Sequence, residues 1–270
     1  YIGGATSSPD LPVTENAFQR RLASGKASES WWDNGDGFAA RISAELDELI
    51  YLTYLGGDNL DFVSHNQGMA IDSNGQLVVT GGTRSSDFPQ VGGASEFGAK
   101  GKLDVFIAVL SEDGSRLIRA TRIGGSAIDD LSGVFVDDQD RIYFTGFTKS
   151  SDWPVTPNAL STRLTNSAGE SFSLERLFSW VNGPKEITPD GVFSVLSSDL
   201  ETLLYSTYLG GSGPVTDYFE RGQAMWIANT GATYIGGLTN STDFPLFGDS
   251  VQKRVFGDID GFFIRFEQRP

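Results

Sequence analysis

The sequence predicts an all-β fold, and three observations support this prediction. A twelve-residue motif occurs four times without a gap, a 22-residue segment with the pattern of a β-hairpin occurs three times and once in part, and a second hairpin-like unit lies between them. Glycine is frequent, with 33 residues, which fits many turns between short strands. We find no long segment with apolar residues at helical spacing.

The twelve-residue motif carries a polar set at the end of a predicted strand. Its copies begin at Tyr1, Val78, Tyr143 and Tyr234. Each copy has Gly, Thr, Ser, Asp and Pro at the same five offsets. An active site is needed once, whereas this set recurs in every copy. We therefore expect its hydroxyls and carboxylates to cap turns and to accept backbone N–H groups.

The two hairpin units alternate with the motif. The 22-residue unit covers residues 36–57, 104–125 and 190–211, with a truncated copy at 260–267; the second unit covers 68–80, 133–145 and 224–236. One period is thus four strands, and the motif recurs at intervals of 77, 65 and 91 residues. Four antiparallel strands per repeat of this length are typical of a β-propeller blade.

We expect residues 1–270 to be a single β-propeller or part of one. Two insertions, at about 19–35 and 157–187, account for the variable spacing and should emerge on one side of the ring. The count gives 14 strands, about three and a half blades, whereas propellers close with about 4–8. Three arrangements satisfy the count: a fragment of a longer polypeptide, a partner chain that completes the ring, or insertions that supply two strands. We favour the first two.

Several segments resemble the bacterial SBBP repeat, a family named for a proposed seven-bladed β-propeller. They are Ser-Thr-Tyr-Leu-Gly-Gly at 206–211, Ala-Ile-Asp-Ser-Asn-Gly at 70–75, Thr-Gly-Phe-Thr at 145–148 and Ser-Asp-Trp-Pro-Val-Thr-Pro-Asn-Ala at 151–159. The resemblance implies a propeller in a large secreted or surface-attached bacterial protein. It implies no common enzymatic activity and supplies no catalytic residues. The chain departs from the pattern at 90–93 and 246–249, where Val-Thr-Pro-Asn is usual.

Composition restricts the partners. The net charge of −15 disfavours binding to nucleic acid or to anionic lipid, both of which are bound mainly through Lys and Arg. No apolar run approaches the roughly 20 residues that span a bilayer, so we expect no membrane insertion. Cysteine is absent, which excludes disulfides and thiolate metal sites. The first residue is a Tyr inside a repeat, so we expect that a leader was removed or that the chain is a piece of a longer one.

Residues that break the repeat are the candidate binding residues. Trp31, Trp32 and Asp33 in the first insertion could stack on a sugar ring or anchor a partner protein, although packing onto the propeller is the simpler interpretation. Trp180 in the second insertion and Tyr218 in a later connection raise the same question.

Acidic residues before the first hairpin are the candidate cation ligands. Asn34 with Asp36, and Asp258 with Asp260, resemble short oxygen-rich calcium loops. A turn before a strand is the favoured interpretation, because Asp104 and Asp190 stand at the same place without a second carboxylate. A further group is expected to be solvated, namely Asp129, Asp130, Asp137, Asp138 and Asp140. The single histidine, His65, is expected to be an ordinary loop residue.

These observations predict a non-enzymatic β-propeller that serves as a structural or protein-binding module. Its expected location is extracellular, on the cell surface or periplasmic. Its expected partner is another chain, or the remainder of a longer polypeptide, that completes the ring, with polysaccharide as a further possibility. The alternatives are a carbohydrate-binding or carbohydrate-active propeller, in which paired carboxylates would act, and a calcium-stabilised surface scaffold.

Overall fold

Fifteen β-strands and no helix make up the described part of this computed structural model, which covers residues 1–24, 34–165, 189–212, 220–254, 256, 257 and 259–267. The strands form four sheets in which every pair of neighbouring strands is antiparallel. The prediction of an all-β fold is confirmed. Within the described ranges, no helix is long and apolar enough to cross a membrane.

The sheets follow one another along the chain. Sheet 1 has the order β1 (Ile2–Thr6), β2 (Asp36–Ile42), β3 (Leu49–Leu55). Sheet 2 has β4 (Asp61–Val63) and β5 (Met69–Ile71) one after the other along the same edge of β6 (Leu77–Thr83), then β7 (Asp104–Leu110) and β8 (Leu117–Ile123). Sheet 3 has β9 (Asp129–Val136), β10 (Ile142–Thr148), β11 (Asp190–Leu196), β12 (Leu203–Leu209). Sheet 4 has β13 (Arg221–Ile227), β14 (Thr233–Thr239), β15 (Asp260–Phe266).

The repeat of the sequence is also a repeat of register. The Thr of the motif pairs with the Asp that opens the next hairpin in all four sheets: Thr6 with Asp36, Thr83 with Asp104, Thr148 with Asp190 and Thr239 with Asp260. Sheets 2 and 3 therefore hold the full set of four strand positions. Among the described residues, sheet 1 lacks the first position and sheet 4 lacks the last.

The predicted hairpins lie at the residues that the repeats indicate. The structure has 15 strands among the described residues, one more than the 14 predicted. In sheets 2, 3 and 4 the first strand begins several residues earlier than the repeat indicated, and in sheet 2 it is divided into β4 and β5. The division falls where β9 and β13 have a register shift against their neighbours. An irregularity therefore interrupts the first strand of sheets 2, 3 and 4 at the same place.

Consecutive sheets pack face to face, and of the four apolar clusters among the described residues, three each join one neighbouring pair of sheets. One joins sheets 1 and 2 and includes Leu55, Val79 and Phe106. A second joins sheets 2 and 3, and a third joins sheets 3 and 4 and includes Phe193, Leu209 and Ile235. The middle strands of sheets 2 and 3 are buried along their whole length, which is why their sequences are almost continuously apolar. β15 occupies the corresponding place in sheet 4, but along this strand exposed residues alternate with buried or half-buried ones.

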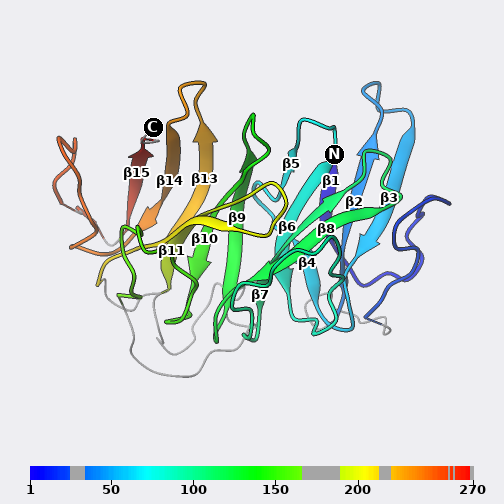
Figure 1. Cartoon of the computed structure of the whole chain (residues 1–270), viewed down its shortest axis with the longest axis horizontal. Coiled ribbons are helices and arrows are strands. Elements are labelled where there is room, and N and C mark those ends of the chain that lie inside the picture. Colours follow the sequence, from blue (N-terminus) through cyan, green and yellow to red (C-terminus); the bar gives the residue numbers. More distant parts are fainter. Residues whose placement is uncertain (25–33, 166–188, 213–219, 255, 258, 268–270) are drawn as a thin grey trace.

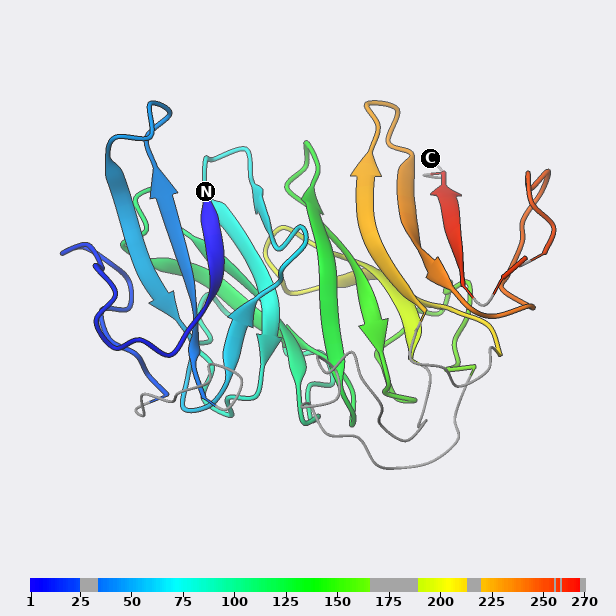
Figure 2. The same ribbon diagram turned by 180° about the vertical axis from the view of Figure 1, so that it is seen from behind.

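Figure 1 shows how the four sheets are arranged in the molecule. The four sheets stand side by side in chain order, and the two termini lie on the sheets at opposite ends. The first strands of sheets 2, 3 and 4 approach one another around Gln67, whose backbone bonds with Ser132 and Val134 and whose side-chain Oε1 accepts the N–H of Met225 at 3.3 Å. Figure 2 gives the reverse view, with the same order of sheets.

In sheets 1, 2 and 3, the segment after the motif covers the outer edge of the last strand. In sheet 1 the N–H of Thr14 donates to Leu52 O at 3.2 Å, and the N–H of Tyr54 donates to Gln19 O at 3.1 Å. Sheets 2 and 3 repeat the arrangement, with residues 91–97 on β8 and residues 156–161 on β12. Covering an edge in this way prevents further strands from pairing with it.

One glycine of the motif is required by the bulge, and sheet 4 offers a matched test. A Cβ on Gly237 would lie 2.1 Å from Arg221 O, whereas a Cβ on its neighbour Gly236 meets nothing nearer than 4.0 Å. We expect Gly237→Ala to lower the free energy of unfolding by about 1–3 kcal/mol, because the backbone of β13 must move. Gly236→Ala should change it by less than about 0.5 kcal/mol. Thermal denaturation of both variants checks this, and equal losses would contradict the close approach.

Candidate functional site

The chain passes from one sheet to the next at three places, which we call passages. At each passage a buried carboxylate accepts hydrogen bonds from the connecting segment. At the first passage, the N–H of Gly57 donates to Asp61 Oδ2 at 2.7 Å, and the hydroxyl of Ser85 donates to the same oxygen at 2.7 Å. The N–H of Asn59 donates in turn to Ser85 Oγ at 2.9 Å. We call this arrangement of an acidic residue, the second glycine of Gly-Gly and the Ser of the motif a carboxylate corner.

The corner is repeated at the other two passages. At the second, Asp129 accepts the N–H of Gly125 at 2.7 Å and the hydroxyl of Ser150 at 2.9 Å, and also bonds with Thr148. At the third, Glu220 accepts the N–H of Gly211 at 2.7 Å and bonds with Thr239. All three acidic residues have 0% exposure.

The polar set of the motif therefore has the role that its recurrence predicted. In each of the four copies, the Thr hydroxyl accepts the N–H of the Ser two residues later, at 2.9–3.1 Å. The Asp of the last three copies accepts the N–H of the residue after Gly-Gly at 2.7–2.8 Å; these carboxylates are Asp87, Asp152 and Asp243.

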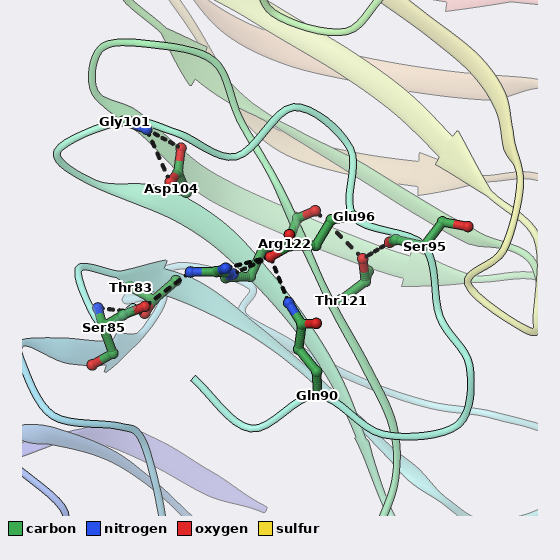
Figure 3. Close-up of polar contacts among 9 residues, drawn as sticks. All are labelled: Thr83, Ser85, Gln90, Ser95, Glu96, Gly101, Asp104, Thr121 and Arg122. Carbon is green, nitrogen blue, oxygen red and sulfur yellow. Dashed lines mark hydrogen bonds and ion pairs between the residues drawn. The ribbon is translucent and has the colours of Figure 1, made fainter. Parts of the chain in front are cut away.

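A second carboxylate at each passage anchors the loop that precedes the 22-residue hairpin. Asp36 accepts the N–H of Ala23 at 2.7 Å and the side-chain amide of Gln19 at 2.8 Å. The other three sheets have the same kind of anchor: Asp104 accepts from Gly101 (Figure 3), Asp190 from Thr165, and Asp260 from Phe256. The donors lie at very different distances along the chain, yet they reach the same carboxylate position.

The two carboxylates of a passage meet on either side of one glycine. A Cβ on Gly124 would lie 2.2 Å from Asp104 Oδ1 and 3.0 Å from Asp129 Oδ2, so no side chain fits between them. Gly56 and Gly210 stand at the same place in the other two passages. Burial raises the pKa of Asp104 to about 6. Burial, with a smaller contribution from the neighbouring carboxylate of each pair, raises the pKa of Asp61, Asp129 and Asp190 to about 7.

The expectation that Asp129 belongs to a solvated acidic group is wrong. Asp129 is buried in the second corner, and Asp130 is beside it with a pKa that burial raises to about 7. Asp137 and Asp140 are at the other end of β9, where Asp137 pairs with Arg141 at 2.7 Å and Asp140 accepts from Ser73. An antiparallel strand of eight residues separates the two ends, so the five carboxylates are not one cluster.

The candidate binding residues of the insertions lie outside the described residues. These are Trp31, Trp32, Asp33, Trp180 and Tyr218, together with Asp258 of the candidate calcium loops. His65 is described; it is in the connection between β4 and β5, with its ring centroid 6.1 Å from that of Phe62.

The remaining candidate calcium ligands take part in loop anchoring. The side-chain amide of Asn34 donates to Ser24 O at 2.9 Å, next to Asp36, and Asp260 is half-buried beside Gln252. Among the described residues, no group of three or more His, Cys, Asp or Glu side chains could hold a metal ion. The recurring signal that sequence reasoning missed is the acidic residue four positions after Gly-Gly, at Asp61 and Asp129, which the longer third connection displaces to Glu220.

Comparison with known proteins does not assign the chain to a family. The sequence matches no protein-family model, and it matches no curated protein sequence.

The raised pKa values set the direction of the pH dependence. A buried carboxyl whose pKa is raised binds its proton more tightly in the folded state, so its contribution to stability is full below about pH 4 and is lost as the pH rises through about 7. We expect the melting temperature to fall between pH 5 and pH 8. Asp129→Asn, which keeps an oxygen for Gly125 and Ser150, should make this fall shallower.

The exposed Asp138 supplies the control, since Asp138→Asn should leave the slope unchanged. A melting temperature that rises from pH 5 to pH 8, or an Asp129→Asn slope equal to that of the parent chain, would contradict the assignment.

The calcium hypothesis has its own test. If Asn34, Asp36, Asp258 and Asp260 bind calcium, addition of a chelator should lower the melting temperature by several degrees, and excess calcium should restore it, because a ligand that binds only the folded state stabilises it. Equal melting temperatures in chelator and in calcium would remove the hypothesis.

Proposed function

We propose that the four sheets are blades of a β-propeller and that the chain is a non-enzymatic structural and protein-binding module. Three features support the propeller. The sheets share one strand order and one register, they pack face to face in chain order, and their first strands converge around Gln67. Radial repetition of four-stranded antiparallel sheets is the propeller arrangement.

The repeated use of the buried carboxylates supports a non-enzymatic role. A pair of neighbouring carboxylates with raised pKa values is the pattern of an acid–base or glycosidase site. Here the pattern occurs at three passages, and Asp61, Asp129 and Glu220 are fully buried and bonded to backbone N–H groups of the chain itself. A group that is withdrawn from solvent and occupied at three equivalent places serves the fold.

Composition and the resemblance to the SBBP repeat support a proposal for where the chain acts and what it meets. We propose a secreted, surface-attached or periplasmic bacterial protein whose partner is another chain or a longer polypeptide that completes the ring. The net charge of −15 supports a partner other than nucleic acid. The aromatic residues of the insertions would form the binding surface.

A carbohydrate-active propeller is the second candidate, and the carboxylate pairs are the observation that favours it. The test is to incubate the purified chain with a panel of polysaccharides and to measure both turnover and binding. We expect no turnover by the parent chain. Turnover that is lost in Asp61→Asn, Asp129→Asn or Asp190→Asn, while the variant still folds, would favour the enzyme and remove the proposal.

The same panel, together with any identified protein partner, tests the insertions. Trp31→Ala combined with Trp32→Ala should weaken binding at least tenfold without changing the melting temperature, because large aromatic side chains dominate binding energy. Unchanged binding in this double variant would exclude the first insertion as the binding surface.

A further inference from the structure

We propose that residues 90–98 form a strap over the outer edge of β8, which a charged clasp holds closed and which opens as the ionic strength rises. The proposal goes beyond the proposed function and does not depend on it, because it concerns how sheet 2 covers its own edge. Its evidence is a comparison of the strap with the segments at the same place in sheets 1 and 3, residues 11–19 and 154–161.

In sheets 1 and 3, a tyrosine of the last strand fixes the motif to that strand. The hydroxyl of Tyr208 donates to Ser150 O at 2.7 Å and accepts the N–H of Trp153 at 3.0 Å. The hydroxyl of Tyr54 donates in the same way to Ser8 O at 2.7 Å. Both tyrosines are at most 1% exposed, so these anchors are shielded from water and from dissolved ions.

Sheet 2 has Arg122 at the position of this tyrosine. Its guanidinium donates to Ser85 O at 2.9 Å, and its charge is met by Glu96 of the strap (Figure 3). One oxygen of Glu96 accepts the Nε–H of Arg122 at 2.7 Å and the side-chain amide of Gln90 at 2.5 Å. We call Gln90, Glu96 and Arg122 the clasp. The side chain of Glu96 is 41% exposed, so dissolved ions reach the clasp but not the tyrosine anchors.

The strap also lacks the threonine that fastens the segments of the other two sheets. In sheet 3 the N–H of Thr156 donates to Ser206 O at 3.1 Å, and the hydroxyl of Thr156 accepts the N–H of Ser206 at 3.1 Å. Thr14 makes the same two bonds in sheet 1. Val91 stands at this position in the strap, and its carbonyl accepts the N–H of Ala120 at 3.2 Å. No hydroxyl is present there to reinforce this bond.

The composition of the strap favours its release. Three of its residues have a positive φ, namely Gly92, Gly93 and Gly98, whereas among the described residues neither of the other two segments has one. Glycine gains more backbone freedom than other residues when a segment is released. No side chain of residues 90–98 is buried, whereas the other segments include Ala17 and Thr156, each 8% exposed.

Both ends of the strap are fixed, so its release gives a loop that is held at two points. Before the strap, Phe88 is 3% exposed and stacks on Phe106 with ring centroids 4.5 Å apart. After the strap, the N–H of Gly101 donates to the carboxylate of Asp104 at 3.1 Å (Figure 3). The clasp lies between these two points, so breaking it frees the middle of the segment.

Release of the strap uncovers the edge of β8. In the closed state the N–H of Phe97 donates to Arg122 O at 3.0 Å, and the N–H of Gly124 donates to Phe97 O at 3.0 Å. These bonds, and the bond from Ala120, pass to water when the strap opens. An uncovered edge can pair with a further strand. The ionic strength therefore sets how often this edge of sheet 2 is open to pairing.

The test is amide hydrogen exchange of the whole chain, measured by NMR at low salt and in about 1 M potassium chloride, where the screening length falls to about 3 Å. We expect the N–H groups of Phe97, Ala120 and Gly124 to exchange at least about threefold faster at high salt, because salt weakens a partly exposed ion pair. The N–H groups of Ser206 and Tyr208, which the segment of sheet 3 covers, are the reference for the general effect of salt.

Two variants test the clasp itself. Arg122→Tyr restores the anchor of sheets 1 and 3 and should remove the effect of salt on the three strap amides. Glu96→Gln keeps an acceptor oxygen but removes the charge, so these amides should exchange fast at both salt concentrations. Because Glu96 is 41% exposed, this variant folds and keeps the test open if Arg122→Tyr does not. Glu112→Gln is the matched control, since it removes the charge of another exposed ion pair, formed with Arg41 at 3.1 Å.

Three results would overturn the proposal. The first is exchange of the strap amides that responds to salt no more than that of the two reference amides. The second is a salt response in Arg122→Tyr or Glu96→Gln equal to that of the parent chain. The third is an equal loss of protection in Glu112→Gln, which would show that any lost surface charge loosens this edge.

Discussion

The fold depends on the carboxylate corner, because it fixes the direction in which the chain leaves each sheet. A sheet-to-sheet connection leaves several backbone N–H groups without partners from a strand, and burying such groups unbonded is costly. One acidic residue, aided by the Ser and Thr of the motif, accepts these groups at all three passages. The same interaction explains why the glycines, hydroxyls and carboxylates of the repeat are found together: each is needed to complete one small network.

Most of the fold could be predicted from the sequence. The four copies of the motif located the strands, and the repeated apolar segments joined by polar turns identified the hairpins. The split of β4 from β5 could not be predicted, since a bulge depends on a close approach between Gly81 and Phe62 O that a single sequence does not reveal. Asp129 was misassigned for a related reason: five carboxylates close in sequence are distributed over both ends of an eight-residue strand, and only pairing shows which end is buried.

The candidate site was predicted less well than the fold. The recurrence of Thr, Ser and Asp predicted that they accept backbone N–H groups at turns, and their hydrogen bonds confirm this role. Their acceptor was harder to see, because Glu220 lies nine residues after Gly211 whereas Asp61 lies four after Gly57. What distinguishes one sheet from another is a small set of substitutions within a constant frame, such as Arg122 in the place of a tyrosine. The local differences between the sheets therefore arise where the sequence departs from the repeat.

The loop anchors have a consequence for how such a chain can change. The backbone N–H donors to Asp36 lie 12 and 13 residues upstream, the backbone donor to Asp104 lies three upstream and the backbone donor to Asp190 lies 25 upstream. Each loop is nevertheless bonded to the carboxylate at the same position of its sheet. Lengthening a tethered loop adds only about 0.6 kcal/mol of closure entropy per doubling. The sheets can therefore accommodate insertions of very different length at this one place without a change in their own structure.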